Sequence, residues 1–361
     1  MRRFGIEEEF LLVDAQTGLP AVPDESAVAA LMNIEGGGSS TSRELLSCQT
    51  ESATPICTNA KQALESLQGY RRALATGAES LGFRAVGIGT APVVPEHPAT
   101  VADTPRYRDM AARAAGIVDD QYVNGLHVHV EVPDRAAGVR VLNSLRPWLP
   151  LFTAIGGNSP MWRGRDSGFA SWRTIHYRRW SVQGIPPCFA GINDYDLRLK
   201  RMLATDVVLD CGHIAWAARL SDTYPTIEVR ASDTQLEAKD SVLIALLIRA
   251  VVGAELEDPA QPDGVADPEM LDIALWKAAR DGLGGELIDP GDGESRPAEE
   301  IVGVLMARIE PVLSRHGDLS FVERGLAGLF ENGTGAQRLR RVHADVGMPG
   351  LLDYAASALL L

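Results

Sequence analysis

Acidic side chains recur on one face of two strand-like segments that lie far apart in the sequence. In the segment GIEEEFLLV near the start, Glu7 and Glu9 project together, because successive side chains of a β-strand alternate between faces. Much later in the chain, TIEVR places Glu228 and Arg230 together in the same way. Carboxylates held close together repel each other unless a cation lies among them, and a divalent metal is the usual cation. The two segments therefore predict a metal site.

Glu8 lies between the first two carboxylates but points to the opposite face, with Ile6 and Phe10. We assign it no role and expect Glu8→Gln to be nearly silent. Replacing Glu7 or Glu228 by Gln, in contrast, is expected to abolish activity. These two changes should also spare or raise the thermal stability of the metal-free protein, because each removes charge repulsion from the cluster.

Two further carboxylates, Glu44 and Glu51, lie in the segment RELLSCQTE, seven positions apart. Because seven is an odd number, an unbroken strand would point them to opposite faces. Both can reach one site only if Glu44 lies before the strand proper or if a β-bulge intervenes. The spacing leaves both alternatives open.

Imidazole groups come from the segment GLHVHVE at residues 125–131, which places Val128 and Val130 on one face and His127 and His129 on the other. Carboxylates with a neutral imidazole form a ligand shell that suits Mg²⁺, and Mn²⁺ accepts the nitrogen more readily. A histidine taken alone is more often a satisfied core residue. His127 is therefore a candidate ligand only in combination with the acidic segments.

Arginines are concentrated between residues 163 and 179 of an otherwise acidic chain, among them Arg173 in the segment ASWR. Binding of phosphate or carboxylate competes there with plain ion pairing to scattered acids, and the two alternatives stay open. The loop QGIPPCF at residues 183–189 is a candidate lining of the second substrate site, although its prolines can simply shape a turn. The sequence contains no Walker A motif.

The predicted elements do not follow a regular βαβ alternation. We predict strands at residues 4–13, 45–54, 83–88, 122–132, 213–220 and 225–231. We predict helices at residues 59–81, 103–115, 134–157, 168–180, 194–204 and 237–256, then further helices joined by Pro/Gly/Asp-rich loops at 257–268 and 281–297. This pattern indicates an α+β fold with a largely antiparallel sheet, polar on one face and covered by helices on the other.

The composition is that of an ordinary globular protein, with 45% hydrophobic and 23% charged residues in a chain of 361. The formal net charge of −14 argues against a nucleic-acid partner. The sequence has no apolar run long enough to cross a membrane, so we expect a soluble, cytoplasmic protein. Its four scattered cysteines argue against a zinc cage or a disulfide framework.

Four motifs in order resemble the glutamate-cysteine ligase superfamily, and within it the type 2, or YbdK-type, carboxylate-amine ligases. They are GIEEE at residues 5–9, the pair Glu44 and Glu51 followed by Thr-Pro, GLH at residues 125–127 and IEVR at residues 227–230. The resemblance covers roughly residues 4–255. It implies a glutamine-synthetase-like fold, a curved antiparallel sheet whose concave face holds ATP and Mg²⁺. It also implies a catalytic domain at residues 1–256, with a helical C-terminal extension at residues 257–361 packed on it.

The resemblance also implies roles for individual residues. One metal near the terminal phosphate would be held by Glu7, His127 and Glu228, and the others by Glu9, Glu44 and Glu51. Arg230 would approach the transferred phosphoryl group, and Arg173 resembles an arginine that binds the phosphates of ATP. His129 aligns with a position that is not a metal ligand in better-known members. We therefore consider it a weaker candidate for a metal ligand than His127.

The implied reaction joins a small carboxylate to an amine. ATP first phosphorylates the carboxylate, and the amine then displaces phosphate from the acyl phosphate, which requires positioning and charge neutralisation rather than an enzyme nucleophile. Glutamate, through its γ-carboxylate, and cysteine are the leading substrates. The alternative function is a phosphotransferase that acts on a guanidino or carboxyl group with the same site. The oligomeric state stays open, with a homo-oligomer as one alternative.

Overall fold

The computed structural model describes residues 2–258 and 267–361. A seven-stranded antiparallel sheet forms its centre, in the order β10-β11-β5-β1-β3-β2, with β4 paired to β1. Its strands are β1 (Phe4–Asp14), β2 (Ser40–Arg43), β3 (Gln49–Ala53), β4 (Phe83–Val86), β5 (Gly125–Glu131), β10 (Ala218–Leu220) and β11 (Thr226–Asp233). The predicted α+β fold with an antiparallel sheet is confirmed.

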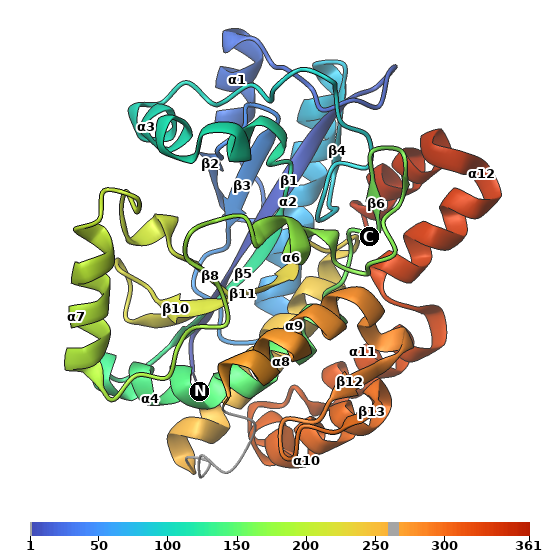
Figure 1. Ribbon diagram of the computed structural model, residues 1–361. Helices are drawn as coiled ribbons and strands as arrows, with labels where there is room; N and C mark the ends of the chain where they lie inside the picture. Colours follow the sequence, from blue (N-terminus) through green and yellow to red (C-terminus); the bar gives the residue numbers. More distant parts are fainter. Residues whose placement is uncertain (1, 259–266) are drawn as a thin grey trace.

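Helices cover the apolar face of the sheet. They are α2 (Ala60–Ser80), α4 (Arg135–Leu145), α5 (Leu149–Ile155) and α8 (Ala238–Glu257), and α8 packs against α2, α4, β1 and β5. Helix α8 is buried along almost its whole length, as expected for a helix that is hydrophobic all round. Figure 1 shows α2 and α8 behind the strands, on the side away from α6 (Trp172–Tyr177).

The alternating pattern of the strands explains which face is buried. Ile6 and Phe10 of β1, together with Val128 and Val130 of β5, are almost fully buried in the core. Glu8 shares their face and is also fully buried. The polar residues of the opposite face lie under shorter helices and loops that fall between residues 106 and 224.

Glu8 is not an inert residue, so the expectation of a nearly silent Glu8→Gln change is revised. Two hydrogen bonds, of 2.9 and 2.6 Å, join its carboxylate to the guanidinium of Arg71 on α2. Ser241 of α8 donates a further hydrogen bond to Glu8. Arg71 also donates to the carbonyls of Gln235 and Leu236. Sequence alternation placed Glu8 on the correct face but did not reveal its partner on a distant helix.

The C-terminal helices pack on helices and on one strand of the first part. Helices α10 and α11 contact α8, α9 contacts α5, and α12 contacts β4. These elements are α9 (Pro268–Asp281), β12 (Glu286–Ile288), β13 (Ser295–Pro297), α10 (Ala298–His316), α11 (Leu319–Asn332) and α12 (Gly335–Ala358). Figure 1 shows them, orange to red, gathered on one side of the molecule. A division of the chain at residue 256 remains a proposal, and most of the predicted loop at 257–268 lies outside the described residues.

Several predicted elements are shorter or divided in the structure. The predicted strand at 45–54 begins only at Gln49, and the predicted helix at 134–157 is two helices joined by the 3₁₀ turn Arg146–Trp148. The sequence reading missed α1 (Glu25–Met32), β2 and three short strand pairings. The remaining elements are α3 (Pro105–Ala114), β6 (Met161–Trp162), β7 (Arg165–Asp166), β8 (Gln183–Gly184), α7 (Ile192–Leu203) and β9 (Ala215–Trp216). Among the described residues, no helix combines the length and the hydropathy needed to cross a membrane.

Candidate active site

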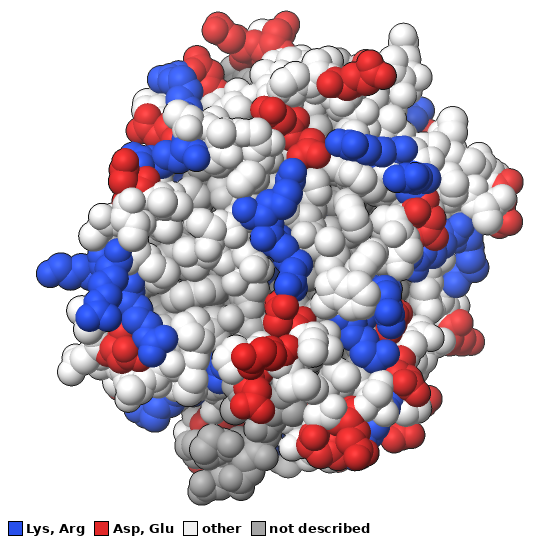
Figure 2. Space-filling view, in the orientation of Figure 1, with Lys and Arg blue, Asp and Glu red and all other residues white. Residues whose placement is uncertain are grey.

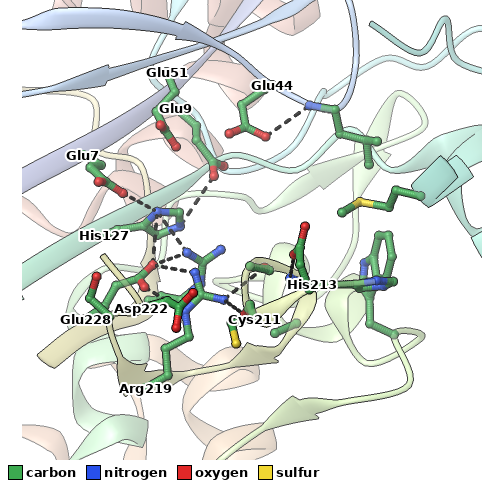
Figure 3. Close-up of a pocket in the computed structure, with 18 of the residues that line it drawn as sticks. Glu7, Glu9, Glu44, Glu51, His127, Cys211, His213, Arg219, Asp222 and Glu228 are labelled. Atoms are coloured by element: carbon green, nitrogen blue, oxygen red, sulfur yellow. Dashed lines mark hydrogen bonds and ion pairs between the residues drawn. The ribbon is translucent and has the colours of Figure 1, made fainter. Parts of the chain in front are cut away.

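A cavity of about 510 Å³ opens on the polar face of the sheet, over β3, β1, β5 and β11. Helix α3 and residues 210–213 and 219–224 contribute to its walls. In Figure 3 the labelled carboxylates of its floor point toward one another and toward the imidazole of His127. All six predicted metal-binding residues line this cavity: Glu7, Glu9, Glu44, Glu51, His127 and Glu228.

Oxygen and nitrogen atoms of these residues lie close enough to share metal ions. Three groups each bring three ligand atoms within 4.8 Å of one another. They are Glu9 with Glu44 and Glu51, Glu7 with Glu51 and His127, and Glu7 with His129 and Glu228. The groups overlap through Glu7 and Glu51, so they form one continuous cluster. Glu228 is grouped here with His129 rather than with His127, its expected companion.

Glu44 reaches this cluster because it lies outside the strands. Strand β2 ends at Arg43 and β3 begins at Gln49, so the odd spacing between Glu44 and Glu51 spans a turn. Of the two alternatives that the spacing left open, the structure shows the first, in which Glu44 precedes the strand proper. Glu51 lies directly opposite Glu9 in the pairing of β1 with β3, which brings all three carboxylates together.

The group of Glu9, Glu44 and Glu51 carries more negative charge than its surroundings neutralise. Burial and the charge of Glu9 raise the pKa of Glu44 to about 7. Burial and the charges of Glu44, Glu7 and Glu9 raise the pKa of Glu51 well above its ordinary value. Both carboxyl groups therefore hold a proton more readily than an isolated glutamate does, as expected where a cation is needed to balance the charge.

His127 is held as a neutral ligand at the centre of the cluster. Its Nδ1 atom lies 3.3 Å from Glu7 Oε2, and its Nε2 atom lies 3.5 Å from Glu9 Oε1 without a hydrogen bond. Burial and the nearby guanidinium of Arg230 lower the pKa of His127. A neutral imidazole has the free lone pair that coordination requires. The Nε2 atom of His129 lies 3.3 Å from Oε1 of Glu7, and its Nδ1 atom lies 3.0 Å from the Thr226 hydroxyl.

Glu7 and Glu228, in contrast, are stabilised as carboxylates. Although burial opposes ionisation, hydrogen bonds from His127 and His129 lower the pKa of Glu7. Burial also opposes the ionisation of Glu228, but the guanidinium groups of Arg230 and Arg219 have the larger effect and lower its pKa well below the ordinary value. The expectation that Glu7→Gln or Glu228→Gln would relieve repulsion is therefore reversed. The first change would leave two histidines without their carboxylate, and the second would leave two arginines without theirs.

Arg230 lies inside the cavity, as predicted, and its side chain is only 12% exposed. Its Nη1 atom donates to Glu228 and lies 3.2 Å from Nδ1 of His127. The pairing of β11 with β5 shifts register between Val229 and Ser232, so Arg230 lies at an irregularity that can re-aim a side chain. Glu228 and Arg230 together line the cavity at its β11 side.

Arg219 is a residue that the sequence reading missed. It lies directly opposite Glu228 in the pairing of β10 with β11, and its Nε donates to Glu228 Oε2 over 2.7 Å. Its Nη1 donates to the carbonyls of Cys211, Gly212 and Ile214. Arg219 thus ties the cavity wall to the floor (Figure 3). The pairing partner of a strand is not visible in a single sequence.

Arg173 does not line the main cavity. Its guanidinium donates to the Arg230 carbonyl over 3.3 Å and lies over the ring of Tyr177. Neighbouring arginines form ion pairs at the surface: Arg178 with Asp272, and Arg163 and Arg179 with Asp120. Figure 2 shows basic side chains in a row over the region of α6, with acidic ones at its ends. Of the two alternatives that the sequence left open, these three arginines therefore form ion pairs with acidic residues of the protein.

Other wall residues also escaped the sequence reading. Gln121, Trp180 and His213 line the cavity, and no role was predicted for them. Nothing in their local pattern marks them, since each lies in a turn or near the end of a short helix. The loop at residues 183–189, expected to line the second substrate site, is absent from the cavity lining among the described residues.

The donor set of this cluster fits divalent cations. Oxygen ligands dominate it, imidazole nitrogens complete it, two of its carboxyl groups carry raised pKa values, and Nε2 of His127 lacks a hydrogen bond. Such a set suits Mg²⁺ or Mn²⁺, whereas zinc would favour sulfur and nitrogen ligands.

Comparisons with known proteins agree with this geometry. The family model described as glutamate-cysteine ligase family 2 matches residues 3–348, so the match continues well beyond residue 255. A relative from Nocardia farcinica with the provisional name glutamate–cysteine ligase 2-1 is 39% identical over 99% of this chain and 93% of its own length. A Mycolicibacterium vanbaalenii relative, provisionally named glutamate–cysteine ligase 2-2, is 40% identical over 99% of this chain and 97% of its own length.

Solved structures share the fold at low sequence identity. Glutamate–cysteine ligase from Francisella tularensis, crystallised with AMP, superposes with a TM-score of 0.70 at 13% identity, over 99% of this chain and 88% of that one. A bifunctional glutathione synthetase from Pasteurella multocida also gives 0.70, at 16% identity, over 99% of this chain and 52% of that one. These likenesses confirm the fold, and the family match and the sequence relatives lead to one conclusion: the chain belongs to glutamate-cysteine ligase family 2.

Proposed function

We propose that this protein is an ATP-dependent carboxylate-amine ligase, which forms an amide through an acyl phosphate. Glutamate, through its γ-carboxylate, is the leading acid and cysteine the leading amine. The observation that carries the proposal is the convergence of five glutamates, two histidines and Arg230 in one cavity of a chain from this family. The names of its relatives support the choice of substrates.

The cluster supports a role for Mg²⁺, with Mn²⁺ as a substitute. The residues that would hold the ions are the members of the three overlapping groups: Glu7, Glu9, Glu44, Glu51, His127, His129 and Glu228. When bound, such ions supply charge neutralisation for the phosphates of ATP. The Francisella tularensis ligase was crystallised with AMP, which supports the use of an adenine nucleotide by this protein.

The protein's own residues would position the reacting groups. Arg230 can donate from the β11 side to the oxygens of the transferred phosphoryl group, where charge is concentrated during transfer. Glu228 and Arg219 hold Arg230 and the adjoining wall in place. Arg173 donates a hydrogen bond to the backbone carbonyl of Arg230, so we place it on the phosphate side as a support for Arg230.

The wall residues and the floor together limit water around an acyl phosphate, which hydrolysis would otherwise destroy. The floor residues Glu9, Glu228 and His127 are at most 8% exposed. Because the reaction consumes ATP, we also propose a cytoplasmic location, where ATP is available.

Product analysis tests the proposal. Purified protein is incubated with ATP, Mg²⁺ and glutamate, with and without cysteine, and the products are identified by mass spectrometry. The proposal predicts ADP, phosphate and a new amide only when the amine is present. A stable phosphorylated acid without amide would instead indicate the phosphotransferase. Screening other amines in the same assay identifies the physiological acceptor.

Glu131→Gln provides a matched control for this assay. Glu131 lies on the same strand as His127 and His129 but pairs with Arg3 outside the cavity. The control should retain full activity, whereas Glu51→Gln should lose it. Equal activity of these two variants would contradict the assignment of the reaction to this cavity.

A further inference from the structure

A second cavity, of about 470 Å³, lies between the N-terminal end of α8, one face of α11 and helix α12. It shares no lining residue with the active-site cavity. Its volume is in the range of cavities that bind small molecules. Charged and aromatic side chains line it together, among them Glu237, Asp240, Phe321, Arg324, Arg338 and Tyr354. None of these residues takes part in the proposed reaction.

Asp240 is an almost fully buried carboxylate with one oxygen left free. The residue is 6% exposed, and its Oδ2 atom accepts a hydrogen bond from Arg338 Nη2 over 2.6 Å. Among the described residues, no group donates to its Oδ1 atom. Arg338 is shared with Glu237, which accepts a hydrogen bond from Nη1. One guanidinium thus serves two carboxylates, and an oxygen of Asp240 remains for a donor from a ligand.

The charge at this end of the cavity is incompletely balanced. Burial and the charge of Glu237 raise the pKa of Asp240, although Arg338 opposes the rise. Lys239 pairs with the other oxygen of Glu237 over 2.5 Å, and its own side chain is mostly exposed. A positively charged donor beside Asp240 would favour its carboxylate form. An ammonium group has this charge and offers three N–H donors.

The same cavity offers a guanidinium without an acidic partner. Arg324 on α11 is exposed and lines the cavity, and no ion pair joins it to an acidic residue in the described part of the chain. The aromatic rings of Phe321, on the same face of α11, and of Tyr354 on α12 add apolar surface to the lining. The cavity therefore combines a free carboxylate oxygen, a free guanidinium and apolar rings.

Gly328 leaves part of the cavity open. A Cβ atom at this position would have no atom within 4 Å, although Gly328 lies within α11 and lines the cavity. At Gly325, three residues earlier, a Cβ atom would meet the side chain of Leu243 on α8 at 3.0 Å. Helix α11 therefore packs tightly on α8 at Gly325 and leaves space at Gly328.

We propose that this cavity binds a free amino acid with an apolar side chain. The ammonium group of the ligand would donate to Asp240, and its carboxylate would accept hydrogen bonds from Arg324. Its side chain would contact Phe321 and Tyr354. A ligand with both charges is favoured because a simple amine would leave Arg324 unused and a simple acid would leave Asp240 unused. The site is separate from the active site and does not depend on the reaction proposed above.

Two other classes of ligand fit this cavity less well. A phosphate group would lie beside the buried carboxylates of Glu237 and Asp240, which would repel it. A metal ion needs several free oxygen ligands, but Arg338 and Lys239 already occupy three of the four oxygens of these two residues. Within the described residues, the groups of side chains that could hold a metal ion all lie in the active-site cavity.

An NMR titration that observes the ligand tests the proposal with three related probes. Phenylalanine carries both charges, 2-phenylethylamine lacks the carboxylate and 3-phenylpropanoate lacks the ammonium group. Phenylalanine should bind with a Kd below about 10 mM, and each of the other two should bind at least about tenfold more weakly. Glu51→Gln, which alters the active-site cavity, should bind phenylalanine as tightly as wild type does.

Gly328→Leu tests the location, because the added side chain would fill the cavity. It should abolish phenylalanine binding without lowering the melting temperature, since leucine favours a helix more than glycine does. Gly303→Leu is its matched control. Gly303 is an exposed glycine within α10, outside both cavities, and a Cβ atom there would also meet no atom within 4 Å. This variant should bind phenylalanine like wild type.

Arg324→Gln tests the same site at an exposed position, where the substitution should leave the fold intact. It should remove the preference for phenylalanine over 2-phenylethylamine. Absence of phenylalanine binding below about 10 mM, equal binding of the three probes, or equal binding by Gly328→Leu and Gly303→Leu would overturn the proposal. An unchanged preference in Arg324→Gln would also overturn it. Loss of binding in Glu51→Gln would do so too, because it would place the ligand in the active-site cavity.

Discussion

At the scale of single residues, the glutamates of the cavity are of two electrostatic kinds. Glu7 and Glu228 have partners that stabilise their negative charge, whereas Glu44 and Glu51 repel each other and have raised pKa values. Sequence spacing predicted mutual repulsion for all of these carboxylates, because spacing shows which carboxylates share a face but not which of them have a cation nearby. The stability of the metal-free protein should therefore respond in opposite directions to changes at the two kinds of site.

Glu51→Gln should raise the melting temperature of the metal-free protein, because it removes one of the repelling carboxylates. Glu228→Gln should lower the free energy of unfolding by about 3 kcal/mol, since it leaves Arg219 and Arg230 buried without their partner. Both variants should lose ligase activity. Thermal and urea unfolding in the presence of a chelator measure the stability, and Glu131→Gln is the control. Stabilisation by Glu228→Gln would contradict this division.

The raised pKa values also predict how pH affects stability. The folded-state pKa of Glu44 is about 7, above its ordinary value of 4.5, so the folded protein binds more protons than the unfolded chain between these pH values. The metal-free protein should therefore lose stability as the pH rises from about 4.5 through 7. Mg²⁺ should offset this loss at the upper end of the range. Urea unfolding at several pH values, with chelator or Mg²⁺, measures both effects, and Glu51→Gln should weaken the dependence.

At the scale of elements, β1 performs two tasks through its alternating faces. Glu7 and Glu9 project into the cavity, while Glu8 anchors the strand to α2 through Arg71 and to α8 through Ser241. This buried pair joins the strand that carries two cluster residues to the helices behind it. A shift of β1 by one residue would exchange the two faces and bring the wrong glutamates into each environment.

Glu8→Gln should therefore destabilise the protein by about 3 kcal/mol, because it leaves Arg71 fully buried without a countercharge. Glu8→Gln should lower activity only in proportion to the loss of folded protein, and the folded variant should keep the metal affinity of the wild type. Glu65→Gln on the exposed face of α2 is the control and should change the unfolding free energy by less than about 0.5 kcal/mol. Equal unfolding curves for the two variants would contradict the role of the buried pair.

The same elements show how far the sequence could predict the site. Alternation within one strand correctly placed Glu7, Glu9, His127 and Glu228 on the polar face. It could not place Arg219, because the pairing of β10 with β11 is a contact between strands whose register the sequence does not reveal. It also could not decide the position of Glu44, which depends on where the turn before β3 ends.

At the scale of the whole molecule, strand order converts distant segments into one site. Strands β1 and β11 are separated by more than two hundred residues, but both pair with β5, so Glu7 and Glu228 lie on either side of its histidines. The α+β class and the polar and apolar faces followed from the strand patterns. The cavity wall that contains Gln121, Trp180 and His213 did not, because these residues are contributed by turns and the ends of short helices that only the complete fold brings together.

The C-terminal helices complete this scaffold from behind. Helices α10 and α11 pack on α8, whose other contacts include β1 and β5, so they support the strands that carry the cluster. The family match over residues 3–348 includes most of these helices. We therefore regard them as part of the structure that positions the active site, whether or not they form a separate domain.

Binding of Mn²⁺ tests the central claim most directly, namely that these side chains form one divalent-metal site for ATP. Free Mn²⁺ can be measured by electron paramagnetic resonance as the ion is titrated into the protein with a non-hydrolysable ATP analogue. Wild type and Glu131→Gln should bind Mn²⁺ equally, and Mg²⁺ should displace it. Glu7→Gln and Glu51→Gln, which alter the residues shared between the groups, should each weaken binding at least about tenfold. Equal Mn²⁺ binding by all four proteins would contradict the account.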